Sequence, residues 1–314
     1  MIIEDFLAFD EHGLYCRRGN FYLDPKQPVK HAVISHAHGD HAVRENEHVY
    51  CTAGTAAIME CRYKRHAAKK FYTYAYKEIF ERNGVQISFI PAGHILGSAQ
   101  VLMIYEGIRY LYTGDFKLQT DPTCEQLEFV QADVLITETT FANPAVQHPD
   151  PVEEIKKLNE SEHNILLGTY ALGKAQRLIY LLNQYCPDRR ILVHHSILPL
   201  NKVYESFGYP PGKYEPYQRK IMKGPTQGHV YMVPPMTFDS YFRAKNVLRA
   251  FASGWERLQL QNDISLLISD HADWNDIVST IEQVNPQHIW TLHGDGHLLK
   301  AHYENQIPIK VMNS

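Results

Sequence analysis

The stretch VISHAHGDHAV, residues 33–43, places four potential metal ligands within six positions. These ligands are His36, His38, Asp40 and His41, and they follow an apolar run with the composition of a buried β-strand. If the chain stays extended beyond the strand, alternation puts the first three side chains on one side and His41 on the other. That arrangement suits two adjacent metal ions better than one. Imidazole and carboxylate ligands favour Zn²⁺ and also suit Mn²⁺ or Fe.

Five other segments repeat this pattern of a short apolar strand followed by His, Asp or Glu. In chain order the residues at these strand ends are His94, Asp115, Glu138, His271 and His293. Six strand ends that carry ionisable groups predict one site at one edge of a sheet system. The site would be assembled from parts of the chain that are far apart in sequence.

The composition is that of a globular protein with a large core. The chain has 314 residues, 44% of them hydrophobic, which is enough for one large or two modest domains. Its five cysteines are scattered without a CxxC pair, which favours reduced thiols in a cytoplasmic protein and argues against a cysteine-bound zinc. The start of the chain lacks a signal-peptide pattern, and no apolar run of about eighteen residues suggests a membrane span.

The middle of the chain differs from the rest in charge and in pattern. Residues 165–261 contain 13 Lys and Arg against 5 Asp and Glu, although the net charge of the whole chain is −4. Strands and helices are predicted to alternate there, including a helix at 241–255. The sequence therefore predicts an α/β domain at 165–261, inserted between two parts of another domain, 1–164 and 262–314. A basic segment suggests contact with a polyanion, although a solvated basic surface has the same balance.

The six residues 36–41 resemble the HxHxDH signature of the metallo-β-lactamase superfamily. His94 in PAGHILGSAQ and Asp115 in YTGDFK follow in the order that this family shows. The resemblance implies an α/β fold, an αββα sandwich with its metal site at one edge. It also implies that one ion takes His36, His38 and His94, that a second takes Asp40 and His41, and that Asp115 bridges the two.

Further pieces resemble the β-CASP nucleases, a group of this superfamily that processes DNA or RNA. Glu138 in ITETTF, His271 in SDHADW and His293 in TLHG resemble the three additional motifs of that group. YALGKAQ and AFASGW resemble parts of the β-CASP domain that is inserted into the lactamase-like fold. Within the group, four pieces resemble the bacterial ligase-associated DNA exonucleases, which are similar to mRNA 3′-end processing factors: GLYCRRGNFYLDP, GDFKLQTDPTC, SGW before the histidine motif, and SDHADW.

The resemblance implies a nuclease that hydrolyses phosphodiester bonds by attack of a metal-bridging hydroxide. Its expected cofactors are two divalent ions, with Zn²⁺ preferred and Mn²⁺ or Fe as alternatives. Metal binding lowers the pKa of the bound water to about 7, which provides the hydroxide at neutral pH. The expected catalytic residues are Asp40, Asp115, Glu138 and His271. His271, held protonated and oriented by Glu138, would donate a proton to the leaving oxygen or clamp the phosphate, and Asp273 is a second partner for it.

Two positions leave alternatives open. His293 is expected to complete the shell of the second ion, but His297 in LHGDGHLL is another possible ligand. Lys117, just after Asp115, is expected either to contact phosphate or to be exposed. Ser98 lacks the strand–GxSxG–helix context of a serine hydrolase, so that reading is set aside.

The expected substrate is single-stranded DNA, degraded by an exonuclease in DNA repair. An ATP-dependent DNA ligase and a helicase are the expected functional neighbours, and no membrane is involved. RNA is the alternative substrate, because eukaryotic DNA-repair members of the group typically carry valine where His293 stands and RNA-processing members carry histidine. A thioesterase or lactonase on the same fold is a further alternative, but it leaves His271 and the basic segment unexplained.

Overall fold

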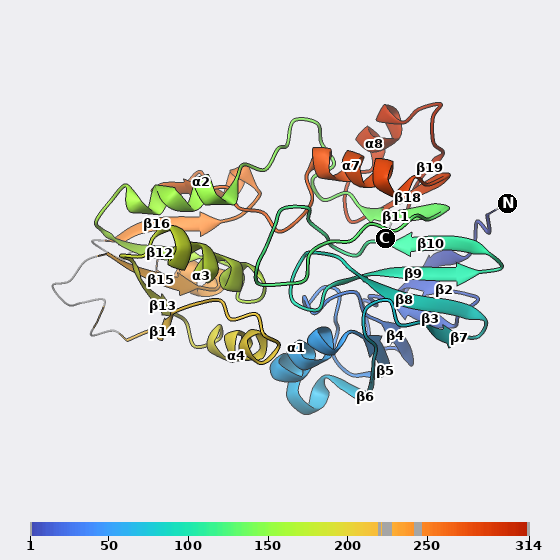
Figure 1. The fold of residues 1–314 in the computed structure, drawn as a ribbon, viewed down its shortest axis with the longest axis horizontal. Helices are drawn as coiled ribbons and strands as arrows, with labels where there is room; N and C mark the ends of the chain where they lie inside the picture. The colour runs from blue at the N-terminus through green and yellow to red at the C-terminus, as the bar shows by residue number, and fades with distance from the viewer. Residues whose placement is uncertain (1, 219–220, 222–227, 242–246, 313–314) are drawn as a thin grey trace. The chain divides into compact units, whose positions relative to one another are not determined.

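The fold is described by a computed structural model that covers residues 2–218, 221, 228–241 and 247–312. The chain forms two compact units (Figure 1). Unit 1 consists of Met1–Thr120, Cys124–Gln147 and His271–Ser314, and unit 2 consists of Asp121–Thr123 and His148–Asp270. Among the described residues, no helix has the length and apolarity needed to cross a lipid bilayer.

Unit 1 is built on two sheets that share one core. Within the described residues, the six-stranded sheet has the order β1 (Leu7–Asp10), β2 (Gly13–Cys16), β3 (Phe21–Leu23), β4 (His31–Val33), β5 (Asn46–Cys51) and β6 (Ala68–Thr73). The seven-stranded sheet has the order β19 (Ile309–Val311), β18 (His288–Leu292), β11 (Val134–Glu138), β10 (Ile108–Tyr112), β9 (Ala99–Tyr105), β8 (Val85–Pro91) and β7 (Phe80–Arg82). Val33 and Tyr50 from the first sheet pack in the same buried cluster as Phe89 and Ile136 from the second.

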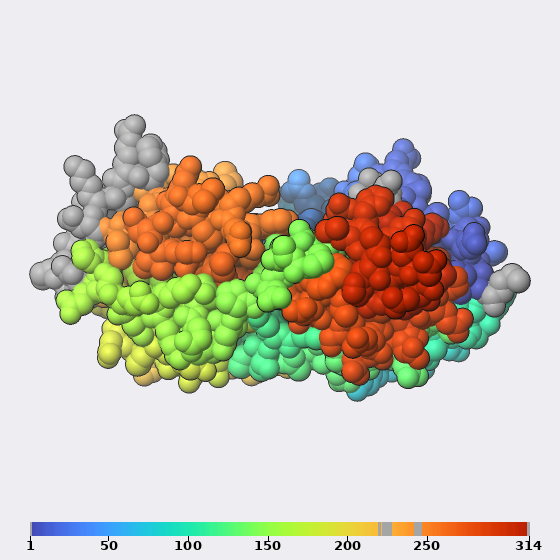
Figure 2. All heavy atoms as spheres, turned by 90° about the horizontal axis from the view of Figure 1, so that it is seen from above, coloured from blue at the N-terminus to red at the C-terminus, as the bar shows by residue number. Residues whose placement is uncertain are grey.

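Helices cover the outer faces of this pair of sheets. Alternate residues of β11 point to opposite sides, so that Ile136 joins the core between the sheets and Leu135 joins a second core outside it. Helix α7 (Trp274–Val284) adds Ile277 and Ile281 to that outer core, and α8 (His297–His302) adds Leu299. Figure 2 shows this C-terminal layer from outside as the red surface. On the other side, α1 (Ala53–Tyr63) contacts β6, which confirms the predicted αββα sandwich.

The described part of unit 2 contains one sheet in which all strand pairs are parallel. Its strand order is β14 (Glu215–Pro216), β13 (Arg190–Val193), β15 (His229–Val233), β12 (Asn164–Gly168), β16 (Val247–Ala252) and β17 (Ile264–Leu266). One face packs against α2 (Pro151–Lys156) and α3 (Lys174–Tyr185), and the other packs against Phe238 of α6 (Pro235–Ser240). Helix α4 (Leu198–Ser206) follows β13.

The predicted helix at 241–255 is wrong, because residues 247–252 form strand β16. This strand pairs with β12 and β17, and its alternate residues Ala250 and Phe251 enter opposite cores. A short apolar run that is buried on both faces has no periodicity that distinguishes a strand from a helix. Residues 242–246 of the predicted helix lie outside the described part of the chain.

Unit 2 is larger than the segment that the sequence marked as an insert. It begins at His148 and ends at Asp270, whereas the predicted boundaries were 165 and 261. The reason is packing, because Ile155 of α2 belongs to the core of this unit and β17 is the edge strand of its sheet. The division of the chain at 1–164, 165–261 and 262–314 stays a prediction.

Candidate metal centre

The candidate site residues belong to unit 1 and lie at the carboxyl ends of its strands. Asp115 follows β10, Glu138 ends β11 and His293 follows β18. These three strands are parallel neighbours, so their carboxyl ends meet at one edge of the seven-stranded sheet. His36 follows β4 of the other sheet. Strand order and direction therefore gather residues that are far apart in sequence.

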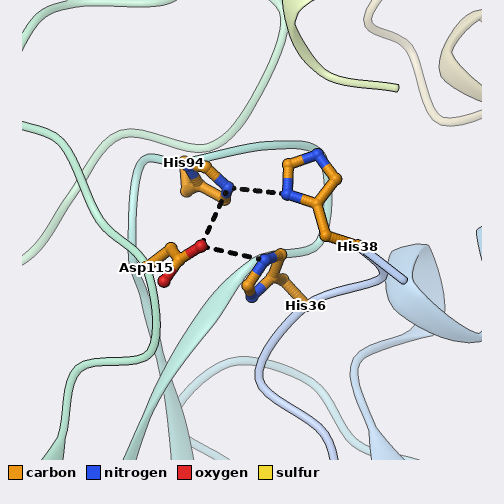
Figure 3. Close-up of side chains that lie close together, drawn as sticks. All are labelled: His36, His38, His94 and Asp115. Atoms are coloured by element: carbon orange, nitrogen blue, oxygen red, sulfur yellow. Dashed lines mark hydrogen bonds and ion pairs between the residues drawn. The ribbon is translucent and has the colours of Figure 1, made fainter. Parts of the chain in front are cut away.

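Three imidazoles and one carboxylate form the centre of the site (Figure 3). His36, His38, His94 and Asp115 each offer one ligand atom, and these atoms lie within 4.8 Å of one another. His94 Nε2 is 3.0 Å from His38 Nδ1, and Asp115 Oδ2 is 3.5 Å from His36 Nε2. Neutral imidazoles with a carboxylate are ligands that Zn²⁺ accepts in proteins.

The environment of His36 tests whether this cluster fits a metal ion. Its Nε2 is buried and makes no hydrogen bond within the described residues, although it faces the cluster. Its Nδ1 lies 3.0 Å from Ser35 Oγ, and the Ser35 hydroxyl itself donates to Asp24 Oδ2 at 2.5 Å. Ser35 therefore accepts the proton of Nδ1, and the lone pair of Nε2 points into the cluster. Burial, together with His41, holds the pKa of His36 well below its usual value, so the ring is neutral, as a metal ligand must be.

Asp115 gives the centre its negative charge. Burial alone would raise the pKa of this carboxyl, but His41 and His271 hold the pKa well below its usual value. Its Oδ2 lies 3.4 Å from His41 Nε2 and 3.9 Å from His271 Nδ1. Burial likewise opposes protonation of His41, yet Asp115 and Asp24 raise the pKa of His41 well above its usual value. The carboxylates thus favour positive charge on this side of the cluster.

The loop that carries the four predicted ligands of residues 36–41 is a turn and not an extended chain. The amides of His41 and Ala42 both donate to the carbonyl of His38, at 3.2 and 2.8 Å. The turn brings the His41 ring to 4.1 Å from the His36 ring, centroid to centroid. The Asp40 side chain is 80% exposed, and its Oδ2 lies 3.8 Å from His41 Nε2. The predicted extended chain, with His41 on the side away from His36, His38 and Asp40, is therefore wrong, because His41 Nε2 lies 3.4 Å from Asp115 Oδ2 as well as near Asp40.

His293 lies beside His41, with 5.1 Å between the ring centroids. Its backbone has a φ of +51°, and its carbonyl accepts a hydrogen bond from Thr140 Oγ1 at 3.2 Å. His297 is an exposed residue at the start of α8, and its amide donates to Asp295 Oδ1. Of the two possible ligands, the structure puts His293 next to a residue of the cluster.

His271 and Glu138 form a pair next to Asp115, one of the four candidate metal ligands. His271 Nδ1 lies 2.9 Å from Glu138 Oε2. Glu138 is buried, and it also accepts hydrogen bonds from the Phe116 amide at 3.0 Å and the Thr140 hydroxyl at 2.6 Å. His271, with 27% of its side chain exposed, remains open to solvent. Asp273, the other predicted partner, caps α7 by accepting the amide of Asp276.

Lys117 and Ser98 support the backbone around His94. Lys117 is buried and donates to the carbonyl of His94 at 2.6 Å, so it is not the exposed lysine that the sequence suggested. Ser98 Oγ accepts the amides of His94 and Ile95 at 3.1 and 3.2 Å, which agrees with setting aside a serine hydrolase. Both side chains fix the loop that carries a metal-cluster residue.

Asp24 is the site residue that sequence reasoning missed. This buried carboxylate follows β3 and accepts the Ser35 amide at 2.7 Å, the Ser35 hydroxyl at 2.5 Å, the Tyr112 hydroxyl at 2.9 Å and His41 Nδ1 at 2.8 Å. It therefore sets the protonated nitrogen of His41 directly and that of His36 through Ser35. The sequence FYLD, residues 21–24, shows the same pattern as the six strand ends identified above, an apolar strand followed by an acid, and could have pointed to Asp24.

Replacing Asp24 with asparagine is expected to weaken Zn²⁺ binding about 10- to 100-fold, the usual effect of removing a carboxylate behind a metal-bound histidine. Asparagine has one acceptor oxygen in place of two, so it cannot keep all four donors satisfied. Zn²⁺ affinity measured by competition with a chromophoric chelator tests this. Asp10→Asn is the control, since Asp10 is an exposed acid on the same sheet that accepts the His12 amide and the Tyr22 hydroxyl and contacts none of the candidate ligands in these hydrogen bonds. Equal Zn²⁺ affinity in wild type and Asp24→Asn would contradict the assignment.

Comparison with known proteins agrees with this geometry. The chain matches the β-lactamase superfamily domain over residues 14–195, which is more than half of its length. A crystal structure of a protein of unknown function from Enterococcus faecalis V583 is similar with a TM-score of 0.59 and 14% identity. That similarity covers 90% of this chain and 79% of that one, and it shows the fold alone.

Three curated proteins are similar to this chain in sequence. The chain is 33% identical over 299 residues to a probable DNA ligase of Opitutus terrae, which covers 90% of this chain and 28% of that protein. It is 28% identical over 214 residues to an RNase J-like protein of Methanocaldococcus jannaschii, covering 57% and 50%. It is 36% identical over 120 residues to cleavage and polyadenylation specificity factor subunit 3 of Dictyostelium discoideum, covering 35% and 15%. The chain thus spans half or less of these relatives. It belongs to the β-lactamase superfamily, and these relatives are consistent with the β-CASP nuclease group within it.

Proposed function

We propose that the chain is a two-metal nuclease that hydrolyses the phosphodiester bonds of single-stranded DNA. The observation that carries the proposal is the position of Asp115. One oxygen of this carboxylate faces His36 of the metal cluster at 3.5 Å and His271 of the Glu138 pair at 3.9 Å. A metal-ligand set and a solvent-accessible histidine with its own carboxylate therefore meet at one point, as hydrolysis with a general acid requires.

The residues present fit two divalent ions, with Zn²⁺ as the first choice. His36, His38 and His94 would hold one ion, Asp40, His41 and His293 would hold the other, and Asp115 would contact both. Ions bound there would lower the pKa of water and would stabilise charge on the oxygens of a phosphate. Asp24 and Ser35 hold His36 and His41 in the tautomers that this requires.

The pair of His271 and Glu138 would handle the proton of the leaving group. Glu138 accepts a hydrogen bond from Nδ1 of His271, and two further donors prevent the carboxylate from turning away. The ring orientation is thereby fixed, and the other ring nitrogen of His271 would face a substrate oxygen. Proton transfer by a positioned side chain contributes about 10²- to 10⁴-fold to a rate.

DNA is preferred over RNA because of the extent of the similarities. The relative named as a probable DNA ligase matches 90% of this chain, whereas the RNase J-like protein matches 57%. The first relative contains a region similar to nearly this whole chain within a longer polypeptide, which supports a functional link to DNA joining. A helicase neighbour, exonuclease mode and a cytoplasmic location stay predictions.

The basic balance of residues 165–261 adds little to the choice of substrate. Among the basic residues described there, Lys174, Arg177 and Arg189 are buried, and Arg190 and Lys202 pair with Glu215 and Glu205. Five others, Arg219, Lys220, Lys223, Arg243 and Lys245, lie outside the described residues. The site in unit 1 therefore carries the proposal.

A nuclease assay on matched strands tests the substrate. Single-stranded DNA and RNA of one sequence, labelled at either end, are incubated with the protein and Zn²⁺ or Mn²⁺. We expect cleavage of DNA at least about tenfold faster than RNA, a difference of about 1.4 kcal/mol in activation free energy. Faster cleavage of RNA would replace the proposed substrate by the RNA alternative. Absence of cleavage with every metal, while a thioester or lactone is hydrolysed, would reject the nuclease.

A further inference from the structure

A buried ion cluster in unit 2 holds the segment that leads to His271. The cluster consists of two cations, Lys174 and Arg177, and two carboxylates, Asp121 and Asp270, none more than 5% exposed. Arg177 Nη1 donates to Asp270 Oδ1 at 3.1 Å, and Arg177 Nε lies 3.8 Å from Asp121 Oδ2. Lys174 Nζ lies 3.7 Å from Asp270 Oδ2. Charges are balanced within the cluster, which is what buried ionic groups require.

The first turn of α3 places both cations on the same segment. Gly173, with a φ of +79°, turns the chain from β12 into this helix, and its amide donates to Gln176 Oε1 at 2.7 Å. Lys174 and Arg177 are three residues apart, so they lie on one face of the helix. The sequence GKAQR thus sends two long cationic side chains in one direction.

These two cations also bind the backbone before His271. Lys174 Nζ donates to the carbonyl of Ile268 at 2.9 Å, and Arg177 Nη1 donates to the carbonyl of Ser269 at 2.7 Å. With the carboxylate of Asp270, three successive residues are bound by one helical turn. Segment 268–270 is therefore held by buried, charge-assisted hydrogen bonds up to the last residue before His271.

On the other side of His271, unit 1 holds the chain independently. The amide of Ala272 donates to the carbonyl of Phe116 at 2.7 Å. Phe116 is also the residue whose amide donates to Glu138, the partner of His271. His271 is consequently flanked on both sides by fixed residues, which limits the directions its ring can take.

We propose that Arg177 is a positioning residue for His271, acting through Ser269 and Asp270. Without the guanidinium, Asp270 becomes a buried carboxylate that has lost a charged donor, and residues 268–270 rearrange to hydrate it. The backbone of His271 then shifts relative to Glu138 and to the substrate. This inference rests on the proposed function, in which His271 serves the leaving group.

The test is a double-mutant cycle of Arg177→Met with His271→Ala. In the wild-type background, Arg177→Met is expected to lower kcat about 10- to 100-fold with KM changed less than about twofold, since misplacement of about 1 Å has effects of this size. In the His271→Ala background the same substitution is expected to change kcat less than about twofold, because its effect passes through the missing ring. Arg177→Lys, which keeps one donor, is expected to recover part of kcat.

Arg189→Met is the matched control. Arg189 is also buried in unit 2 and donates to the carbonyls of Leu158, Ser161 and His163, away from segment 268–270. We expect it to lower the melting temperature while kcat stays within about twofold of wild type. An equal loss of kcat in both His271 backgrounds, or wild-type kcat in Arg177→Met, overturns the proposal. If Arg177→Met does not fold, Arg177→Lys takes its place in the cycle, and wild-type kcat there overturns the proposal.

A second measurement separates this inference from the proposed function. Wild-type activity and the loss in His271→Ala are determined first, and if His271→Ala keeps the wild-type rate, it is the proposed role of His271 that fails. Hydrogen exchange of the His271 and Ala272 amides then tests the clamp without activity. Exchange is expected to be at least about tenfold faster in Arg177→Met than in Arg189→Met, and equal exchange rates overturn the clamp.

Discussion

Replacing Asp115 with asparagine is expected to lower kcat for phosphodiester hydrolysis by at least about 10⁴-fold, or about 5.4 kcal/mol in activation free energy. Asp115 is the residue on which the site converges, with its Oδ2 within 3.9 Å of nitrogen atoms of His36, His41, His94 and His271. Asparagine keeps the shape and removes the negative charge. The four histidines then face a neutral amide, and two cations can no longer share a carboxylate.

The measurement combines single-turnover hydrolysis of labelled DNA with metal content from native mass spectrometry. We expect the variant to lose at least one of the two ions and to keep the circular dichroism spectrum of the wild type. Asp133→Asn is the control, because Asp133 precedes the same strand that ends on Glu138 and accepts the Arg109 amide at the opposite end. Full activity of Asp115→Asn would show that the reaction does not use this cluster.

The sequence was sufficient to predict the architecture and most of the side chains that meet at the site. The reason is that strand direction does the assembly. Because β10, β11 and β18 are parallel neighbours, an acidic or histidine residue at the carboxyl end of each must reach the same edge. Local pattern and sheet topology agree here. A polar residue at the end of a strand in the sequence can therefore be placed at a known edge of the sheet in the fold.

The residues that were misplaced depend on contacts that the local pattern does not contain. The orientation of Asp40 and His41 is decided by two hydrogen bonds to the His38 carbonyl, which turn the chain where alternation assumed that it was extended. Asp24 acts through donors from two other segments, residues 35–41 and strand β10, and its importance appears only when those segments are packed together. A lysine is usually found on the surface, but Lys117 is buried because the carbonyl of His94 accepts a hydrogen bond from its ammonium group.

The error at 241–255 has a different origin. Its alanines and leucine favour a helix by propensity. The segment forms a strand because it pairs on both sides, with β12 and with β17. Tertiary pairing overrides propensity when both faces of a short segment are buried. The same principle explains why the boundaries of unit 2 follow the packing of α2 and β17 and not the charge distribution along the chain.

Replacing His271 with alanine is expected to lower kcat about 10²- to 10⁴-fold while both metal ions remain bound. A loss of this size is what a general acid contributes to a rate. The metal content should persist because His271 pairs with Glu138 and is not one of the four residues grouped around His36. Its Nδ1 nevertheless lies 3.9 Å from Asp115, and Asp115, Glu138 and His271 themselves form a group that could hold a metal. Activity alone therefore does not distinguish a proton donor from a ligand.

The nature of the leaving group does distinguish them. A substrate whose leaving group is a nitrophenol needs little protonation, so a missing proton donor should slow its hydrolysis by less than about tenfold. A missing metal ligand should slow both substrates alike and remove an ion from the mass spectrum. His297→Ala is the control, an exposed histidine at the start of α8, and it should leave the rate and metal content unchanged. A similar loss for both substrates in His271→Ala, with an ion missing, would make His271 a ligand and leave the proton to another group.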